Sequence, residues 1–149
     1  MADGDVVTLI EHDHREIERL FDELGTDRDD RPQLLEKIAA LFVAHSRAEE
    51  AEVYPVAREE TGEQEVEHSA EEHAEAERML QHLRSLDPAG AEFDEHLATL
   101  VDAVTHHVNE EEATVLPGLA ARVSRDRLVE LGSAFESRKL HELQQNPHH

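Results

Sequence analysis

The sequence contains no cysteine, no tryptophan and a single tyrosine among its 149 residues. Without cysteine the chain can form neither a disulfide framework, nor an iron–sulfur cluster, nor a zinc site of the cysteine type. Any metal must therefore be bound through nitrogen and oxygen. Long apolar runs are also lacking, and the start of the chain, Met1-Ala2-Asp3-Gly4-Asp5, is acidic where a signal peptide would be basic. We expect a cytoplasmic protein.

Positive charge is scarce, because 14 lysines and arginines stand against 36 acidic residues and leave a formal net charge of -22. Nucleic acids and anionic lipid surfaces are bound through lysines and arginines that neutralise phosphate. We therefore expect neither nucleic acid nor membrane as a partner. High charge with only 38% hydrophobic residues is also compatible with disorder. The helical periodicity described next favours a single folded domain over residues 1–149.

Apolar residues recur every three or four positions in four long segments, at about residues 6–24, 32–54, 63–86 and 91–116. Polar, proline- or glycine-containing stretches separate them, and Pro55 is expected to bend or end the second. A shorter amphipathic segment follows at about 124–143, and residues 144–149 form a tail that includes His148 and His149. The pattern predicts an all-α fold, with a bundle over residues 6–120 and an additional short C-terminal helix. That helix packs across the bundle or against a second copy.

Twelve histidines are the unusual feature of the composition, and two of them begin a repeated phrase. The second and fourth segments contain His45-x-x-x-Glu49-Glu50 and His107-x-x-x-Glu111-Glu112, and both phrases continue with Ala, Val and Pro at matching positions. Residues four apart lie on one face of a helix, so each phrase presents an imidazole and a carboxylate together. The chain is therefore predicted to be two helical hairpins in tandem.

An exposed ion pair is the ordinary explanation of such spacing, which His14 with Glu18 and His68 with Glu72 also show. However, the histidines at 14, 45, 73 and 107 each continue an apolar stripe. Burying them with carboxylates would cost several kcal/mol per group without a compensating charge. Helical bundles hold di-iron and di-manganese sites with such residues, so we predict a two-metal site.

The remaining histidines and most glutamates are expected at the surface. Five histidines lie on polar stretches or opposite an inward residue, namely His12, His68, His82, His96 and His141. His106 would reach the site only through a local backbone change. The glutamate-rich runs around Glu49-Glu50, Glu71-Glu72 and Glu110–Glu112 are predicted to be mostly solvated.

These phrases, with Asp13-His14 and Glu72-His73, resemble the hemerythrin-like, or HHE cation-binding, domain over about residues 6–120. The resemblance implies an up-and-down four-helix bundle around two iron ions in an oxo- or hydroxo-bridged, non-heme centre. It assigns His14 and His45 to one iron and His73 and His107 to the other. Glu49 and Glu111 would bridge the two ions.

The sequence departs from oxygen-carrying hemerythrins one turn after His73, where those proteins have a further histidine and this chain has Glu77. A carboxylate there favours ferric over ferrous iron and argues against reversible oxygen carriage. Tyr54, the single tyrosine, either caps the core or supplies a phenolate ligand in place of the missing histidine. Glu77 is the competing candidate for that place.

We expect a centre that reacts with hydrogen peroxide, with nitric oxide or with both, in a catalase- or peroxidase-like detoxification. The alternative is a module that binds or senses oxygen, nitric oxide or iron without turnover. A third possibility is a helical interaction protein with adventitious metal. Small molecules are the expected partners, and the chain is expected to be a monomer or weak homodimer. Iron or manganese remains open for the second metal.

Overall fold

The computed structural model describes residues 4–145, and the predicted all-helical fold is confirmed over them, with no strand in that range. The helices in chain order are α1 (Val6–Thr26), α2 (Arg31–Ala48), η2 (Glu49–Val53), α3 (Tyr54–Thr61), α4 (Glu63–Arg84), α5 (Ala91–Glu110), η3 (Glu111–Val115), α6 (Leu116–Arg122) and α7 (Arg125–Gln145). The tail histidines His148 and His149 lie outside the described residues. Within the described range, no helix is both long and apolar enough to cross a membrane.

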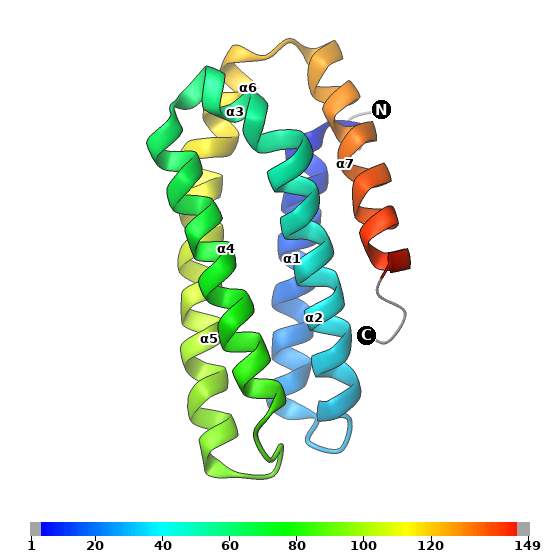
Figure 1. The fold of residues 1–149 in the computed structure, drawn as a ribbon, viewed down its shortest axis with the longest axis vertical. Helices are drawn as coiled ribbons and strands as arrows, with labels where there is room; N and C mark the ends of the chain where they lie inside the picture. The colour runs from blue at the N-terminus through cyan, green and yellow to red at the C-terminus, as the bar shows by residue number, and fades with distance from the viewer. Residues whose placement is uncertain (1–3, 146–149) are drawn as a thin grey trace.

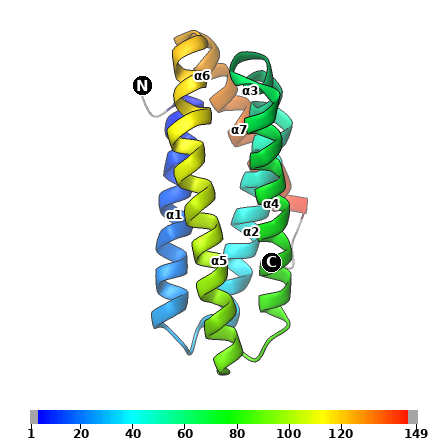
Figure 2. The ribbon, with the colours of Figure 1, turned by 90° about the vertical axis from the view of Figure 1, so that its left-hand side faces the viewer.

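The long helices α1, α2, α4 and α5 lie side by side, and consecutive ones run in opposite directions (Figures 1 and 2). Each packs against two of the others, because α1 contacts α2 and α5, and α4 contacts α2 and α5. The four helices therefore enclose a common interior. The short helices α3 and α6 lie together at one end of the bundle.

At the opposite end, the buried side chain of Arg31 connects the two loops that close the hairpins. Its guanidinium donates to the carbonyl oxygens of Leu24 and Pro88 and to a carboxylate oxygen of Asp94, at 2.7–3.0 Å, and lies 4.8 Å from the centre of the Phe93 ring. These fixed partners satisfy a charge that would otherwise be costly to bury. Arg31 thereby aligns the two hairpins.

Two apolar clusters fill the interior, and a polar layer separates them. On α1, Ile10 belongs to the cluster next to α3 and α6, Ile17 to the cluster toward the hairpin loops, and His14 lies between them. The same order holds along α2, α4 and α5, where the buried histidines fall between residues of the two clusters. The polar layer is thus shielded from water on both sides.

Both repeated phrases contain a turn of π-helix directly after the inward glutamate. The N–H of Tyr54 donates to the carbonyl of Glu49, and the N–H of Leu116 donates to that of Glu111, five residues back in each case. Proline follows at once in both phrases, and it lacks an N–H and crowds the carbonyl four residues earlier. The widened turn takes up this disruption, so the helical run continues through Pro55 into α3.

The C-terminal helix predicted at about 124–143 is α7, which at 21 residues is as long as α1 instead of short, and it packs on α1 and α2. Its apolar residues Leu128, Leu131 and Phe135 are buried against the bundle. Gly132 lets it approach closely, since a Cβ there would lie 2.1 Å from the carbonyl oxygen of Gly4. The sequence had left open whether this helix covers the bundle, and in the structure it does.

Candidate metal centre

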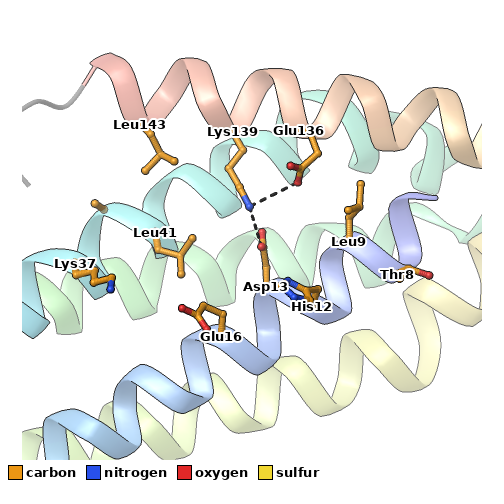
Figure 3. Close-up of a pocket in the computed structure, with 11 residues that line it drawn as sticks. Thr8, Leu9, His12, Asp13, Glu16, Lys37, Leu41, Glu136, Lys139 and Leu143 are labelled. Atoms are coloured by element: carbon orange, nitrogen blue, oxygen red, sulfur yellow. Dashed lines mark hydrogen bonds and ion pairs between the residues drawn. The ribbon is translucent and has the colours of Figure 1, made fainter. Parts of the chain in front are cut away.

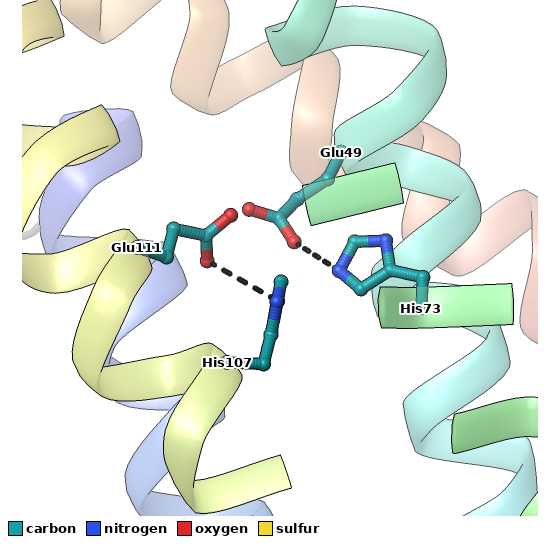
Figure 4. A group of neighbouring side chains, drawn as sticks. All are labelled: Glu49, His73, His107 and Glu111. Atoms are coloured by element: carbon teal, nitrogen blue, oxygen red, sulfur yellow. Dashed lines mark ion pairs between the residues drawn. The ribbon is translucent and has the colours of Figure 1, made fainter. Parts of the chain in front are cut away.

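Four histidines and two glutamates from the four long helical runs converge in the polar layer. They are His14 of α1, His45 of α2, Glu49 of η2, His73 of α4, His107 of α5 and Glu111 of η3. All are at most 4% exposed, and both glutamates are fully buried. Figure 4 shows four of them pointing toward one another. The structure therefore brings together all six residues for which the sequence predicted this role.

The six side chains form two groups that share a carboxylate. Glu49, His73, His107 and Glu111 have ligand atoms within 4.8 Å of one another, and so do His14, His45 and Glu111. Glu111 Oε1 lies 3.0 Å from His14 Nε2 and 4.0 Å from His107 Nε2. Glu49 Oε1 similarly lies 3.0 Å from His45 Nε2 and 3.2 Å from His73 Nε2. Each carboxylate thus stands between histidines of different groups.

Most of the inward nitrogen and oxygen atoms of this cluster have no hydrogen-bond partner. Among the described residues, the unpaired buried atoms include Nε2 of His14, His45 and His107, both carboxylate oxygens of Glu49, and Oε1 of Glu111. Buried polar atoms are rarely left unpaired, because each costs free energy. A set of imidazole nitrogens and carboxylate oxygens turned toward one point is suited to metal cations. The residues present therefore fit a metal pair.

The contacts between imidazoles and carboxylates also shift the pKa values of this cluster. Burial alone would lower the pKa of His45, but the carboxylates of Glu49 and Asp13 raise it to about 10. Burial alone would also lower the pKa of His73, but the carboxylates of Glu49 and Glu50 raise it to about 9. Burial would raise the pKa of the Glu49 carboxyl, yet His45 and His73 hold it well below its usual range. The carboxylate of Glu49 and the imidazoles of His45 and His73 thus favour one another's charged forms.

A second ring of carboxylates holds the four histidines from outside. Each histidine Nδ1 donates to a carboxylate of a neighbouring helical run, and the pairs are His45 to Asp13 (2.8 Å), His73 to Glu50 (2.9 Å), His107 to Glu72 (2.9 Å) and His14 to Glu112 (2.7 Å). These bonds fix each ring and leave Nε2 facing the centre. They link α1 to α2, η2 to α4, α4 to α5 and η3 to α1, so they form a closed circuit.

The prediction of mostly solvated faces is wrong for Glu50, Glu72 and Glu112, whose side chains are 34%, 17% and 23% exposed. Each is adjacent in sequence to an inward ligand, and adjacent residues on a helix point about 100° apart. That rotation turns an outer carboxylate toward the neighbouring helix instead of toward water. The recoverable signal was an acidic neighbour beside four of the six predicted ligands, in the doublets Asp13-His14, Glu49-Glu50, Glu72-His73 and Glu111-Glu112.

Comparison with known proteins agrees with this geometry. The family model of the hemerythrin HHE cation binding domain matches residues 5–119. This chain belongs to the hemerythrin HHE cation-binding family. It is also 28% identical over 141 residues to a protein of Nostoc sp. (strain PCC 7120 / SAG 25.82 / UTEX 2576) named DNA nickase. That alignment covers 92% of this chain but 40% of the relative's length. No solved structure matches the chain.

Helix α7 lies beyond the residues that match the hemerythrin model, yet it touches the centre's supports. The ring of Phe135 meets that of His45 edge-on, with centroids 5.5 Å apart. Lys139 Nζ lies 2.8 Å from Asp13 Oδ1 (Figure 3). Asp13 in turn accepts a hydrogen bond from His45. A groove of about 840 Å³ between α1, α2 and α7 is lined by both Asp13 and Lys139. The supporting contacts of Asp13 and Lys139 were not predicted from the sequence.

Tyr54 and Glu77 were competing candidates for one additional ligand of the hemerythrin-like centre, and the structure places them differently. Tyr54 is buried, and its hydroxyl donates to Glu111 Oε2 at 2.7 Å and lies 3.4 Å from His73 Nε2. Burial and the nearby carboxylates raise the pKa of Tyr54 well above its ordinary value. Glu77 instead binds Arg47 through both oxygens, at 2.9 and 3.0 Å. The structure thus brings Tyr54, and not Glu77, to the cluster.

The histidines predicted at the surface are exposed. They are His12, His68, His82, His96 and His141, and His106 joins them without reaching the centre. His82 and His96 contact each other across α4 and α5, with ring centroids 4.6 Å apart.

Proposed function

We propose that this chain binds two iron ions in a four-helix hemerythrin-type centre and removes hydrogen peroxide, nitric oxide or both. The observation that carries the proposal is the sharing of Glu111 between two groups of potential ligands. A carboxylate between two sets of histidines is the arrangement that dinuclear sites in helical bundles use. Imidazole-rich sets with carboxylates suit iron, and manganese is the alternative for one position.

Each residue of the buried cluster has a role in this proposal. His14 and His45 would hold one ion, His73 and His107 the other, and Glu49 and Glu111 would lie between them. When bound, two adjacent iron ions supply the redox change needed to convert two molecules of peroxide into two of water and one of oxygen. The outer carboxylates keep the imidazoles oriented, and the apolar clusters exclude bulk water.

Tyr54 is the proposed additional ligand, in the place that a histidine takes in oxygen carriers. Its hydroxyl already lies within hydrogen-bond reach of Glu111 and close to His73. In the metal-free chain the raised pKa keeps the phenol protonated, and that proton lies on the bond to Glu111 Oε2. A bound ferric ion would favour the phenolate. This ligand set supports consumption of oxygen's reduced forms over reversible carriage.

We do not propose DNA cleavage for this chain, although the Nostoc relative is named DNA nickase. This chain aligns with 40% of that protein, and its net charge of -22 opposes approach to a phosphate backbone. We propose small molecules as partners. A cytoplasmic location remains part of the proposal.

The activity is tested by loading the chain with iron and measuring oxygen evolved from hydrogen peroxide. We expect a rate well above that of the same amount of free iron, and loss of the excess in His107→Ala. His96→Ala, which removes an exposed histidine of the same helix, is the control and should keep the rate. Circular dichroism checks that both variants stay helical.

Two results would overturn the proposal. One is a wild-type rate equal to that of free iron in both peroxide and nitric oxide assays. The other is uptake of oxygen by the anaerobic ferrous protein that reverses fully on degassing, which would identify a binding or sensing module.

A further inference from the structure

A second set of potential metal ligands lies on the surface of the bundle, on α4 and α5. His68 and Glu72 are four residues apart on α4, and His106 and Glu110 are four residues apart on α5. Each pair shares a helix face, and the two helices pack against each other. The histidine–glutamate spacing of the buried phrases thus occurs again on the outside.

Three of the four side chains, those of His68, Glu72 and Glu110, have ligand atoms within 4.8 Å of one another, and His106 lies beside this group. His68 Nε2 lies 3.2 Å from both Glu72 Oε2 and Glu110 Oε2. His106 Nε2 lies 3.7 Å from Glu72 Oε2 and 3.5 Å from Glu110 Oε1. In tetrahedral coordination with bonds of about 2.0–2.1 Å, neighbouring ligand atoms are about 3.3 Å apart. His68, Glu72 and Glu110 could therefore bind one ion with little rearrangement, and a movement of the exposed His106 side chain would add the fourth ligand.

Glu72 is held in place independently of any surface ion. Its Oε1 accepts from His107 Nδ1 at 2.9 Å, and its side chain is only 17% exposed. The other oxygen, Oε2, is thereby presented to His68 and His106. An oriented carboxylate lowers the entropic cost of assembling a site from side chains that are otherwise exposed. The strongly negative chain also attracts cations toward this face.

We propose that His68, Glu72, His106 and Glu110 form a surface site for a divalent transition-metal cation, separate from the buried centre. Imidazole nitrogens favour zinc, copper, nickel or iron over magnesium and calcium. Zinc is the suitable probe, because it has no redox chemistry and readily accepts two nitrogens and two oxygens. The competing explanation is a set of exposed histidine–glutamate ion pairs, which need no metal.

The test is a calorimetric titration of the iron-loaded chain with zinc, with iron content measured before and after. We expect about one zinc per chain at this site, and loss of that equivalent, or at least a tenfold weaker affinity, in the double variant His68→Ala/His106→Ala. The matched control is His12→Ala/His141→Ala, which removes two exposed histidines elsewhere and should bind zinc as the wild type does.

Two outcomes would overturn the surface site. In one, the wild-type chain takes up no zinc beyond its buried centre. In the other, both double variants lose zinc equally, which would indicate diffuse binding by exposed histidines. If the chain does not load with iron, the same comparison on chelator-treated protein still decides the question, since the expected difference between the variants is one zinc. Failure of the buried centre is thus distinguishable from failure of this site.

Discussion

At the scale of single residues, the buried centre depends on an alternation of inward ligands and outward supports. His14 and Asp13 are neighbours in sequence, yet one faces the cluster and the other holds His45 on the next helix. The two kinds of residue are separated by a single step along the helix. Substitutions at adjacent positions should therefore have different consequences for metal binding.

Replacement of Glu50 by glutamine tests the outer ring. We expect Glu50→Gln to lower iron affinity by about 10–100-fold, because the charged acceptor of His73 Nδ1 is lost while the inward ligands remain. Competition with a chelator of known affinity measures this change. Glu71→Gln, at an exposed position of α4, is the matched control and should leave the affinity unchanged. Equal affinities in wild type and Glu50→Gln would show that the outer carboxylates do not tune the centre.

Replacement of Tyr54 by phenylalanine tests the additional ligand. The iron-loaded wild type should show a visible tyrosinate-to-iron charge-transfer band, and Tyr54→Phe should lack it while keeping its iron. The chain has no other tyrosine, so the assignment is unambiguous. A wild type without the band would leave Tyr54 as a hydrogen-bond donor to Glu111 only.

At the scale of elements, α7 is the part of the chain that the family model does not cover but the site uses. Phe135 is fully buried against the bundle and contacts His45. We expect Phe135→Ala to lower the free energy of unfolding by about 3–5 kcal/mol, through lost burial and the cavity left behind. Leu140→Ala on the same helix, where the side chain is 57% exposed, should change it by less than about 0.5 kcal/mol. Urea unfolding of metal-free protein measures both, and similar values would mean that α7 is not packed as described.

Asp5 joins the start of α1 to the start of α7. Its carboxylate accepts from the backbone N–H of Thr8 at 2.9 Å, as a helix N-cap, and lies 2.7 Å from Arg125 Nη1. Burial alone would raise the pKa of Asp5, but Thr8 and Arg125 hold it below its ordinary value of 3.8. The charged form therefore stabilises the fold above that value, and the stabilisation is lost as the pH falls through the lowered pKa.

The variant Asp5→Asn keeps the capping acceptor and removes the charge. At pH 7 it should be less stable than the wild type by roughly 1 kcal/mol. The difference should disappear at pH values below the lowered pKa, where the wild-type carboxyl is also neutral. Urea unfolding at several pH values checks this, and a difference independent of pH would contradict the role of the charge.

Sequence patterns predicted the elements well where apolar periodicity was continuous, and less well at their ends. Pro55 suggested a break, because a proline has no N–H to continue the helix. The π-turn at Glu49–Val53 takes up that disruption, and it is a backbone detail that side-chain periodicity cannot report. The bounds of α7, Arg125–Gln145, differ from the predicted 124–143 by at most two residues, although Leu140 near its end is 57% exposed.

At the scale of the whole molecule, the four inward histidines were predictable because they continue apolar stripes, and the repeat paired two of them with glutamates. The supporting contacts were not predictable in the same way. Lys139 reaches Asp13 across 126 positions of sequence, and Glu77 turns to Arg47 instead of the centre. Such choices depend on which helices are neighbours and on their rotation. Neither the neighbours of a helix nor its rotation can be predicted from the periodicity of one sequence.

Metal binding at the inward ligands should stabilise the molecule as a whole. Because the inward ligands come from every long helix, a bound metal pair would connect all four and add its binding free energy to folding. The metal-free chain must instead accommodate buried, unpaired nitrogens and oxygens in the middle of its core. Metal occupancy and stability should therefore rise together.

The buried two-metal centre is best tested by the iron content per chain. It is determined by metal analysis on protein purified after iron loading and removal of loosely bound ions. The proposed centre predicts close to two irons per chain in the wild type and far less in His45→Ala, with the same helical content by circular dichroism. A wild-type content well below one iron per chain, or an unchanged content in His45→Ala, would contradict a buried two-metal centre.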